Sequence, residues 1–321
     1  MNAAGEILTK SWLRAIGDRP MRVVLAEGED PRSAEAARRL ADTTPIVPVL
    51  ADRSYVAEVR THPLIAAALS QALAGRSAYE RRHLARSPLY VAAAAVRTGL
   101  ADACVGGSDR PTGEVIRAAL RVLGKAPGVH TVTSSFLMGL SDGRVIAYAD
   151  CAVVPEPDPA QLAEIAIATS RTFADLAGQE PVVAMLSFST KGSAQHARVD
   201  CVRSAVDLVR KWAPTLEVDG EMQFDAAFAA DVGSRKAAAS AVPGRVNVFV
   251  FPSLEAANIA YKITERLAGA TAIGPFLQGL AAPMNDLSRG CSAADIVAVA
   301  LASAVQAMRQ APYEDVSLQA L

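Results

Sequence analysis

Short apolar runs alternate along the chain with longer stretches in which apolar residues recur at helical spacing. The short runs are rich in β-branched residues, which is typical of buried strands. We predict strands over residues 23–25, 46–50, 103–105, 129–136, 145–154, 182–187, 246–251 and 270–273. We predict helices over residues 63–100, 112–123, 197–212, 253–268 and 292–308. Because uninterrupted apolar strands alternate with helices, the pattern predicts an α/β fold with largely parallel sheets.

Helix starts and one hairpin refine this picture. Asp30 before a proline and Asp158 three residues before a glutamine are both typical of an N-cap. The two strands within 129–154, joined by a turn at 141–143, predict a hairpin that breaks the alternation. A chain of 321 residues exceeds the usual size of one core, so we expect a domain junction near this hairpin. The predicted domains are 1–135 together with 292–321, and 136–291.

Composition and charge exclude several classes of function. The chain is 51% hydrophobic and 20% charged, and its net charge of −1 favours neither nucleic acid nor an anionic membrane as a partner. Its four scattered cysteines form no C-x-x-C pair, which indicates reduced thiols and no metal site. Neither a secretory signal nor a membrane-spanning stretch is evident. We therefore expect a soluble cytoplasmic protein that binds small molecules.

One segment, residues 283–295, places a hydroxyl, a guanidinium and a carboxylate where a loop becomes a helix. Ser288 and Arg289 lie in the loop, and Asp295 lies in the first turn of the helix. An anionic substrate would meet a bidentate cation and free backbone N–H groups here. Ser292 and Asp295 also have the spacing of a capping box, and by spacing alone a cap is the favoured role of this carboxylate.

A second candidate loop, within residues 185–194, follows a predicted strand. Ligands of open α/β sheets bind outside the carboxyl ends of the strands, where such loops provide backbone donors. The spacing fits neither a Walker A loop nor a dinucleotide fingerprint, and a plain polar turn explains the loop equally well. Its candidate ligand-binding residues are Ser189, Thr190, Lys191 and Gly192.

A third candidate segment, residues 101–117, runs from a strand through a glycine pair into a helix. The glycines would allow a ligand to approach the backbone closely, and Thr112 and Arg117 are candidate contacts at the helix start. Taken alone, Arg117 is more typical of a solvated helix face. Cys151 has no positive neighbour in sequence and is more typical of a buried, inert thiol than of a nucleophile. We interpret residues 274–280 as a turn.

Together these segments resemble the phosphate acetyltransferase (phosphotransacetylase) family. The matching segments follow the family's order and cover the C-terminal half almost continuously: 183–194, 219–227, 247–252, 258–262, 274–280 and 285–295. The first half matches more loosely, through 27–32, 100–102 with the glycine pair, and 125–128.

The resemblance implies reversible transfer of an acetyl group between coenzyme A (CoA) and phosphate. It implies a two-domain α/β fold with parallel and mixed sheets, like that of isocitrate and isopropylmalate dehydrogenases, with the active site in the interdomain cleft. It also implies a homodimer, with CoA as a substrate and no permanently bound cofactor. In the family's mechanism the residue matching Asp295 takes the proton of the CoA thiol, and those matching Ser288 and Arg289 orient and stabilise the reacting groups. Arg117 then becomes a CoA contact, Thr112 remains a candidate substrate contact, and 189–192 would line the phosphate end.

The chain departs from the family in two places. The region 40–80 is shorter than usual, and Arg76 is our candidate there for a second CoA contact. After the glycine pair, residues 110–112 read Arg-Pro-Thr where the family often has His-Ser/Thr. Two alternatives stay open: transfer of a propanoyl or butanoyl group, and a non-catalytic acyl-CoA-binding regulator. A dehydrogenase lacks any nucleotide fingerprint here.

Overall fold

The computed structural model describes residues 1–310, and the end of the first predicted domain, residues 311–321, lies outside them. The chain divides into two compact units. A six-stranded unit comprises Met1–Leu8 and His130–Gly279. A four-stranded unit comprises Thr9–Val129 and the chain from Leu280 onward. The N-terminal helix α1 (Ala3–Ile16) begins in the first unit and continues into the second.

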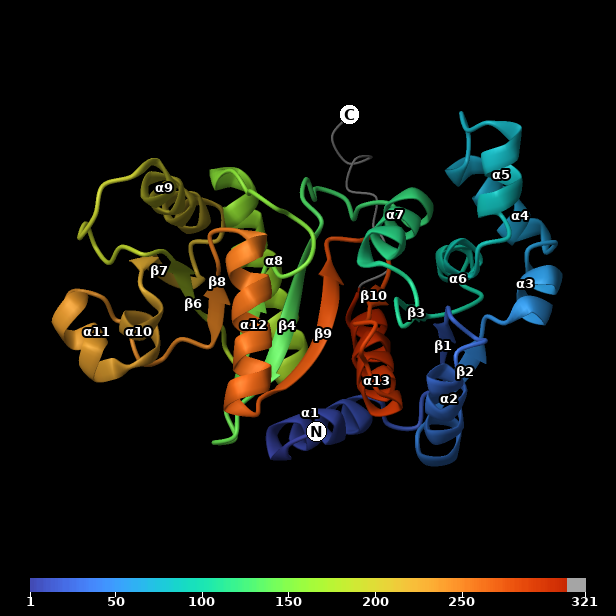
Figure 1. The fold of residues 1–321 in the computed structure, drawn as a ribbon, viewed down its shortest axis with the longest axis horizontal. Coiled ribbons are helices and arrows are strands. Elements are labelled where there is room, and N and C mark those ends of the chain that lie inside the picture. Colours follow the sequence, from blue (N-terminus) through green and yellow to red (C-terminus); the bar gives the residue numbers. More distant parts are fainter. Residues whose placement is uncertain (311–321) are drawn as a thin grey trace. The chain divides into compact units, whose positions relative to one another are not determined.

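The four-stranded unit contains an all-parallel sheet with strand order β10-β3-β1-β2 (Figure 1). Its strands are β1 (Met21–Leu25), β2 (Ile46–Leu50), β3 (Ala103–Gly106) and β10 (Met284–Asp286). Helices α2 (Pro31–Thr43) and α13 (Ala293–Arg309) pack on one face, and α6 (Pro88–Arg97) and α7 (Thr112–Val122) on the other. Since all four strands are parallel, the loops after their carboxyl ends gather at one edge.

Three shorter helices complete this unit: α3 (Arg53–Val59), α4 (Pro63–Ala72) and α5 (Ala78–Leu84). The prediction of one helical stretch over 63–100 was therefore wrong. Gly75 lies in the left-handed region (φ +79°) just after α4, and Pro88 stands at the start of α6. A left-handed glycine ends a helix and a proline begins one, so α4, α5 and α6 are separate.

The six-stranded unit contains a mixed sheet with strand order β7-β6-β8-β5-β4-β9. Strand β4 is antiparallel to both of its neighbours, and the other pairs are parallel. The strands are β4 (Thr133–Gly139), β5 (Val145–Ala149), β6 (Val182–Leu186), β7 (Glu217–Met222), β8 (Val248–Val250) and β9 (Thr271–Gln278). The predicted α/β fold with parallel and mixed sheets is thus confirmed.

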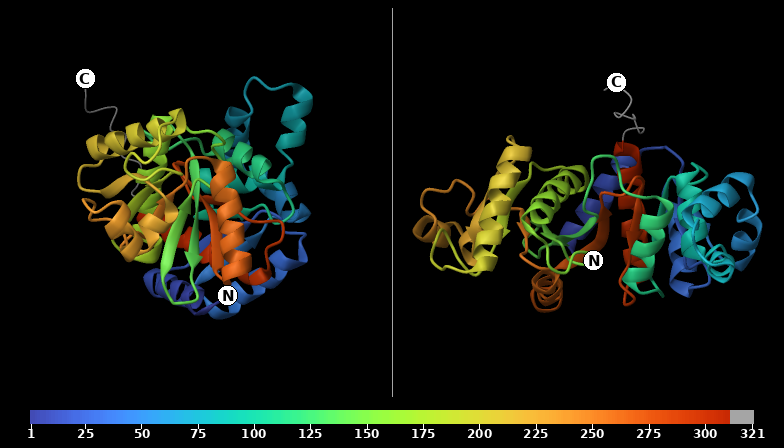
Figure 2. Two further views of the ribbon diagram at one scale, coloured as in Figure 1. Left: turned by 60° about the vertical axis from the view of Figure 1, so that its left-hand side comes forward. Right: turned by 90° about the horizontal axis from the view of Figure 1, so that it is seen from above.

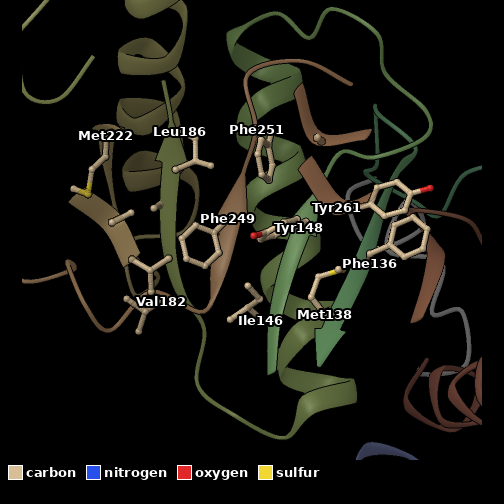
Figure 3. Packing of buried hydrophobic residues seen from close by; sticks show 14 of the residues in the cluster. Phe136, Met138, Ile146, Tyr148, Val182, Leu186, Met222, Phe249, Phe251 and Tyr261 are labelled. Atoms are coloured by element: carbon tan, nitrogen blue, oxygen red, sulfur yellow. The ribbon is translucent and has the colours of Figure 1, made fainter. Parts of the chain in front are cut away.

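Helices cover both faces of this mixed sheet. Figure 2 shows α8 (Pro159–Ala177) and α9 (Ala197–Trp212) on the side opposite α12 (Leu254–Ala268). Two short helices, α10 (Phe224–Phe228) and α11 (Ala230–Lys236), follow β7. Between the layers, Tyr148 meets Phe249 and Phe251 edge-on, with ring centroids 5.8 and 5.0 Å apart (Figure 3). Phe136 stacks on Tyr261 at 4.1 Å. This aromatic cluster anchors α12 to the sheet.

Two strand predictions in this unit need correction. The segment 274–280 was interpreted as a turn, but most of it belongs to β9. Because β9 is an edge strand, it tolerates the missing N–H of Pro275. The strand predicted over 145–154 ends at Ala149, since the Asp150 carboxylate accepts from the backbone N–H groups of Ala152, Val153 and Val154 and so bends the chain away. No helix of the described residues is long and apolar enough to cross a membrane.

Candidate functional site

Arg32, in the first turn of α2, joins three loops at the carboxyl edge of the four-stranded sheet. Its Nη1 donates to the carbonyls of Arg289 (2.8 Å) and Cys291 (3.0 Å). Its Nη2 donates to the Asp30 carboxylate (2.7 Å) and to the Ser108 carbonyl (2.7 Å). The loops after β1, β3 and β10 are therefore held together by one guanidinium, which sequence analysis did not single out.

In the loop after β10, the side chains of Ser288 and Arg289 are available to contact a ligand. Both residues are exposed. The Ser288 hydroxyl accepts from the Gly290 N–H at 3.3 Å, so its own proton is available for donation. Within the described residues the Arg289 guanidinium makes no ion pair, while its backbone is fixed by Arg32. The loop thus presents a positioned but unsatisfied cation, as bidentate recognition of a phosphate requires.

The third member of the predicted trio, Asp295, forms the capping box expected from its spacing. Its Oδ2 accepts from the N–H and the hydroxyl of Ser292, each at 2.8 Å, and its own N–H donates to the Ser292 hydroxyl at 3.3 Å. The other oxygen, Oδ1, has no hydrogen bond among the described residues. A capped carboxylate of this kind is held in a fixed orientation and keeps one open acceptor.

A buried carboxyl that sequence analysis missed lies beside this loop. Asp286 ends β10 and is only 1% exposed. Its Oδ2 accepts from the Thr112 hydroxyl at 2.6 Å, and its buried Oδ1 has no partner. Burial raises the pKa of Asp286 to about 7, against the Thr112 hydrogen bond, which lowers it. No apolar run marked this position in the sequence, because β10 is only three residues long and contains Asn285.

Gly107 and Glu27 complete this buried region. A side chain at Gly107 would place its Cβ 2.1 Å from Asp286 Oδ1, and φ at this residue is +99°, so only glycine fits. The Gly107 N–H donates to the Glu27 carboxylate at 2.9 Å. Burial raises the pKa of Glu27 as well, although that hydrogen bond opposes the shift. Two carboxyls of raised pKa therefore flank the glycine pair.

A basic pocket of about 430 Å³, here called the Arg117 pocket, opens between α6 and α7 in the same unit. Arg110 pairs with Glu114 at 3.8 Å, and Arg121 donates to the Tyr90 hydroxyl at 3.0 Å. Arg76, the candidate for a second CoA contact, pairs with Glu80 at 3.5 Å and is not among the lining residues. The arginines that line the pocket are Arg86, Arg110, Arg117 and Arg121.

The 189–192 loop belongs to the six-stranded unit, and β7 uses most of its polar groups. The Ser189 hydroxyl and the Gly192 N–H both donate to the Glu221 carboxylate, at 2.9 and 2.8 Å. The Thr190 hydroxyl donates to the Gln223 side chain at 3.2 Å. The Lys191 ammonium pairs with Asp219, and its backbone lies in the left-handed region (φ +47°). In this conformation the polar groups of the loop are satisfied by Glu221, Gln223 and Asp219.

The structure therefore groups the predicted residues by unit. Ser288, Arg289 and Asp295 lie in one loop and helix start, and Thr112 and Arg117 lie on α7 of the same unit. The four residues of the 189–192 loop lie in the other unit. Within the described residues no group of His, Cys, Asp or Glu side chains could hold a metal ion.

Comparisons with known proteins agree with this geometry. The family model "Phosphate acetyl/butaryl transferase" matches residues 66–304. A phosphate acetyltransferase from Paracoccus denitrificans is 46% identical over 88% of this chain and 94% of its own length. A solved phosphotransacetylase from Streptococcus pyogenes superposes with a TM-score of 0.85 at 34% identity, covering 96% of this chain and 99% of that one. The EutD phosphotransacetylase from Staphylococcus aureus superposes with a TM-score of 0.83 at 38% identity, covering 94% of this chain and 99% of that one. The resemblance identified from the motifs is thereby confirmed.

Proposed function

Since this chain belongs to the phosphate acetyl/butaryl transferase family, we propose that it catalyses reversible transfer of an acetyl group between CoA and phosphate. The observation that carries the proposal is the loop after β10. It combines Arg289, which has no ion pair among the described residues, a Ser288 hydroxyl with its proton available, and an oriented Asp295 at the carboxyl edge of a parallel sheet. The enzyme is an acyltransferase, and acetyl-CoA, phosphate, acetyl phosphate and CoA are its substrates and products.

CoA binding is assigned to the Arg117 pocket. CoA carries several phosphate charges, and four arginines line this pocket with a single carboxylate, that of Glu114, beside them. Guanidinium groups bind phosphates bidentately and retain their charge at any physiological pH. The Thr112 hydroxyl is bound to Asp286, so we assign Thr112 to positioning the start of α7 as well as to contacting CoA.

The reaction proceeds by direct attack within a ternary complex. Asp295 accepts the thiol proton of CoA through its open oxygen, and the thiolate attacks the carbonyl carbon of acetyl phosphate. The new C–S bond forms as the carbonyl becomes an oxyanion; the C–O bond to phosphate then breaks and phosphate leaves. Ser288 donates to the oxyanion, and Arg289 neutralises the departing phosphate. A free thiol has a pKa of about 8.5, so a carboxylate held in place is a sufficient base.

The assignment of the base is tested by comparing Asp295→Asn with Ser292→Ala. Both substitutions disrupt the same capping box, but only the first removes the carboxylate. We expect Asp295→Asn to lower kcat about 100- to 10,000-fold, as loss of a general base does, and Ser292→Ala to retain most activity. The measurement is thioester formation from CoA and acetyl phosphate. Equal losses in both variants would assign Asp295 to the cap alone.

A companion variant, Arg289→Ala, tests the loop as the reaction site. We expect kcat to fall about 100- to 1,000-fold with an unchanged unfolding transition, because this guanidinium pairs with no other side chain among the described residues. An active Arg289→Ala enzyme would place the chemistry elsewhere.

Propanoyl and butanoyl phosphates are assayed in parallel, because one methylene group alters preference about 10- to 200-fold. CoA binding without any turnover would instead favour a regulatory acyl-CoA-binding protein.

We also propose a cytoplasmic homodimer without a permanently bound cofactor. Helix α12 supports the dimer, because it presents a stripe of aliphatic side chains that is exposed within residues 1–310. Ile259, Ile263 and Leu267 are 54%, 52% and 83% exposed and recur every four residues on one face.

The 189–192 loop is assigned to the phosphate end of the substrate site. There its backbone geometry, set by Glu221, positions Lys191 beside Ser189 and Thr190.

A further inference from the structure

A second arginine-lined pocket, of about 330 Å³, lies between α3, α4 and α5 of the four-stranded unit. We call it the Arg82 pocket. Its arginines come from the end of α3, from α5 and from the residue that follows the α5 cap. Neither the family resemblance nor the proposed mechanism uses it. The arginines that line it are Arg60, Arg81, Arg82 and Arg86.

The charge in this pocket is unbalanced. No carboxylate lines it, and within the described residues none of the four arginines forms an ion pair. Arg82 donates to a backbone carbonyl, that of Ala78. The chain has 33 acidic residues for 32 basic ones, and other arginines of the same unit are paired, such as Arg39 with Glu35 at 2.7 Å. Four unpaired like charges repel one another unless an anion joins them.

Apart from its arginines and Ser70, the pocket is lined by apolar residues. Leu69 and Leu73 of α4 are 3% and 2% exposed, and Ala66 and Ala85 lie beside them. The volume is at the lower end of the usual range for small-molecule sites, about 300 to 1,000 Å³. A ligand that fits must therefore be small, carry its negative charge at one end, and have an apolar body.

We propose that the Arg82 pocket is a second anion site, which binds a small phosphate monoester with an apolar body. A monoester carries between about 1.5 and 2 negative charges at neutral pH, so it matches several guanidiniums better than a carboxylate does. The apolar body rests on Leu69 and Leu73. This site is separate from the acetyl-transfer loop.

Arg86 links this site to the proposed CoA site, because it lines both the Arg82 pocket and the Arg117 pocket. One guanidinium cannot serve two anions fully at once. A monoester in the Arg82 pocket therefore withdraws Arg86 from CoA and weakens CoA binding, and by linkage CoA weakens monoester binding equally. The Arg82 pocket is thus a regulatory site whose ligand inhibits. This second part of the inference rests on the assignment of CoA to the Arg117 pocket.

Phenyl phosphate is the probe for the site, titrated calorimetrically into the full chain. The pocket variant is Arg81→Gln/Arg82→Gln. The control is Arg38→Gln/Arg39→Gln, which removes an adjacent arginine pair of equal charge from the exposed face of α2. We expect the pocket variant to bind phenyl phosphate at least tenfold more weakly and the control to bind it like the wild type.

Three results would overturn the anion site: no binding of phenyl phosphate to the wild type, unchanged binding in the pocket variant, or equal losses in both double variants. If inorganic phosphate bound as tightly as phenyl phosphate, the ligand would need no apolar body, and that part of the proposal would be contradicted. These binding measurements require no turnover, so they test the anion site even if the proposed activity is not found.

The coupling is measured by titrating CoA with and without saturating phenyl phosphate. We expect the Kd for CoA to rise about fivefold or more in the wild type, within the usual range of coupling between sites, and to stay constant in Arg81→Gln/Arg82→Gln. An unchanged Kd in the wild type would overturn the regulatory role. Failure of CoA to bind at all would contradict the CoA assignment instead.

Discussion

At the scale of single residues, the buried Asp286 makes stability depend on pH. Its pKa of about 7 in the folded state lies above the ordinary value of 3.8, because burial disfavours the charged form. Between these values the folded state binds more protons than the unfolded state, so this group's contribution to stability falls as pH rises through that window. Each unit of pKa difference corresponds to about 1.4 kcal/mol.

Asp286→Asn removes the ionisation and keeps an acceptor for the Thr112 hydroxyl. We expect the variant to gain stability relative to the wild type as pH rises from about 4 to about 8, as measured by urea unfolding at several pH values. The matched control is Asp207→Asn, at an exposed position of α9. Parallel stability profiles for wild type and Asp286→Asn would show that this carboxyl is not perturbed.

At the scale of elements, β7 is held by ion pairs between its acidic side chains and α9. Glu221 is 2% exposed and accepts from the Arg203 guanidinium at 2.8 and 2.9 Å. Burial would raise the pKa of Glu221, but Arg203, the Gly192 N–H and the Ser189 hydroxyl together lower it to about 2. The stability gained from Glu221 is therefore present above pH 4.5 and is lost as pH falls towards 2.

Arg203→Met leaves Glu221 without its cation. We expect a loss in the free energy of unfolding that is smaller than for a fully buried pair, because the Arg203 side chain is 36% exposed and partly screened by solvent. The control is Arg235→Met, which breaks an exposed pair with Asp231 and should change stability little. Urea unfolding measures both. Equal effects would mean that the Glu221 pair stabilises no more than a surface pair does.

The elements differ in how well sequence patterns predicted them. Helix α9 was predicted with its observed bounds, and the starts of α2 and α8 followed from Asp30 and Asp158, because a cap is a local contact. Strand β7 was missed, since a run as polar as Glu217–Met222 is buried only when partners from other segments neutralise it. The edge strand β9 was predicted only over 270–273, and its second part was interpreted as a turn because Gly274 and Pro275 are typical of turns.

At the scale of the whole molecule, the α12 stripe predicts the state of assembly. We expect the wild type to sediment as a dimer and Ile263→Glu/Leu267→Glu to sediment as a monomer, because buried carboxylates without partners oppose association. The two side chains are exposed within the chain, so the variant should keep its fold by circular dichroism. The control is Arg266→Ala on the same helix. A monomeric wild type, or a dimeric double variant, would contradict this interface.

The sequence alone determined the α/β class and the family, because these depend on periodicity and on short motifs whose residues are neighbours in the chain. It also placed the proposed reacting trio Ser288, Arg289 and Asp295 in one segment. Only the tertiary structure showed that Arg32 joins three loops and that Asp286 is buried without a full set of hydrogen bonds. It alone revealed the two arginine-lined pockets. These features arise from residues far apart in sequence, whose burial, charge and hydrogen bonding exist only after the chain has folded.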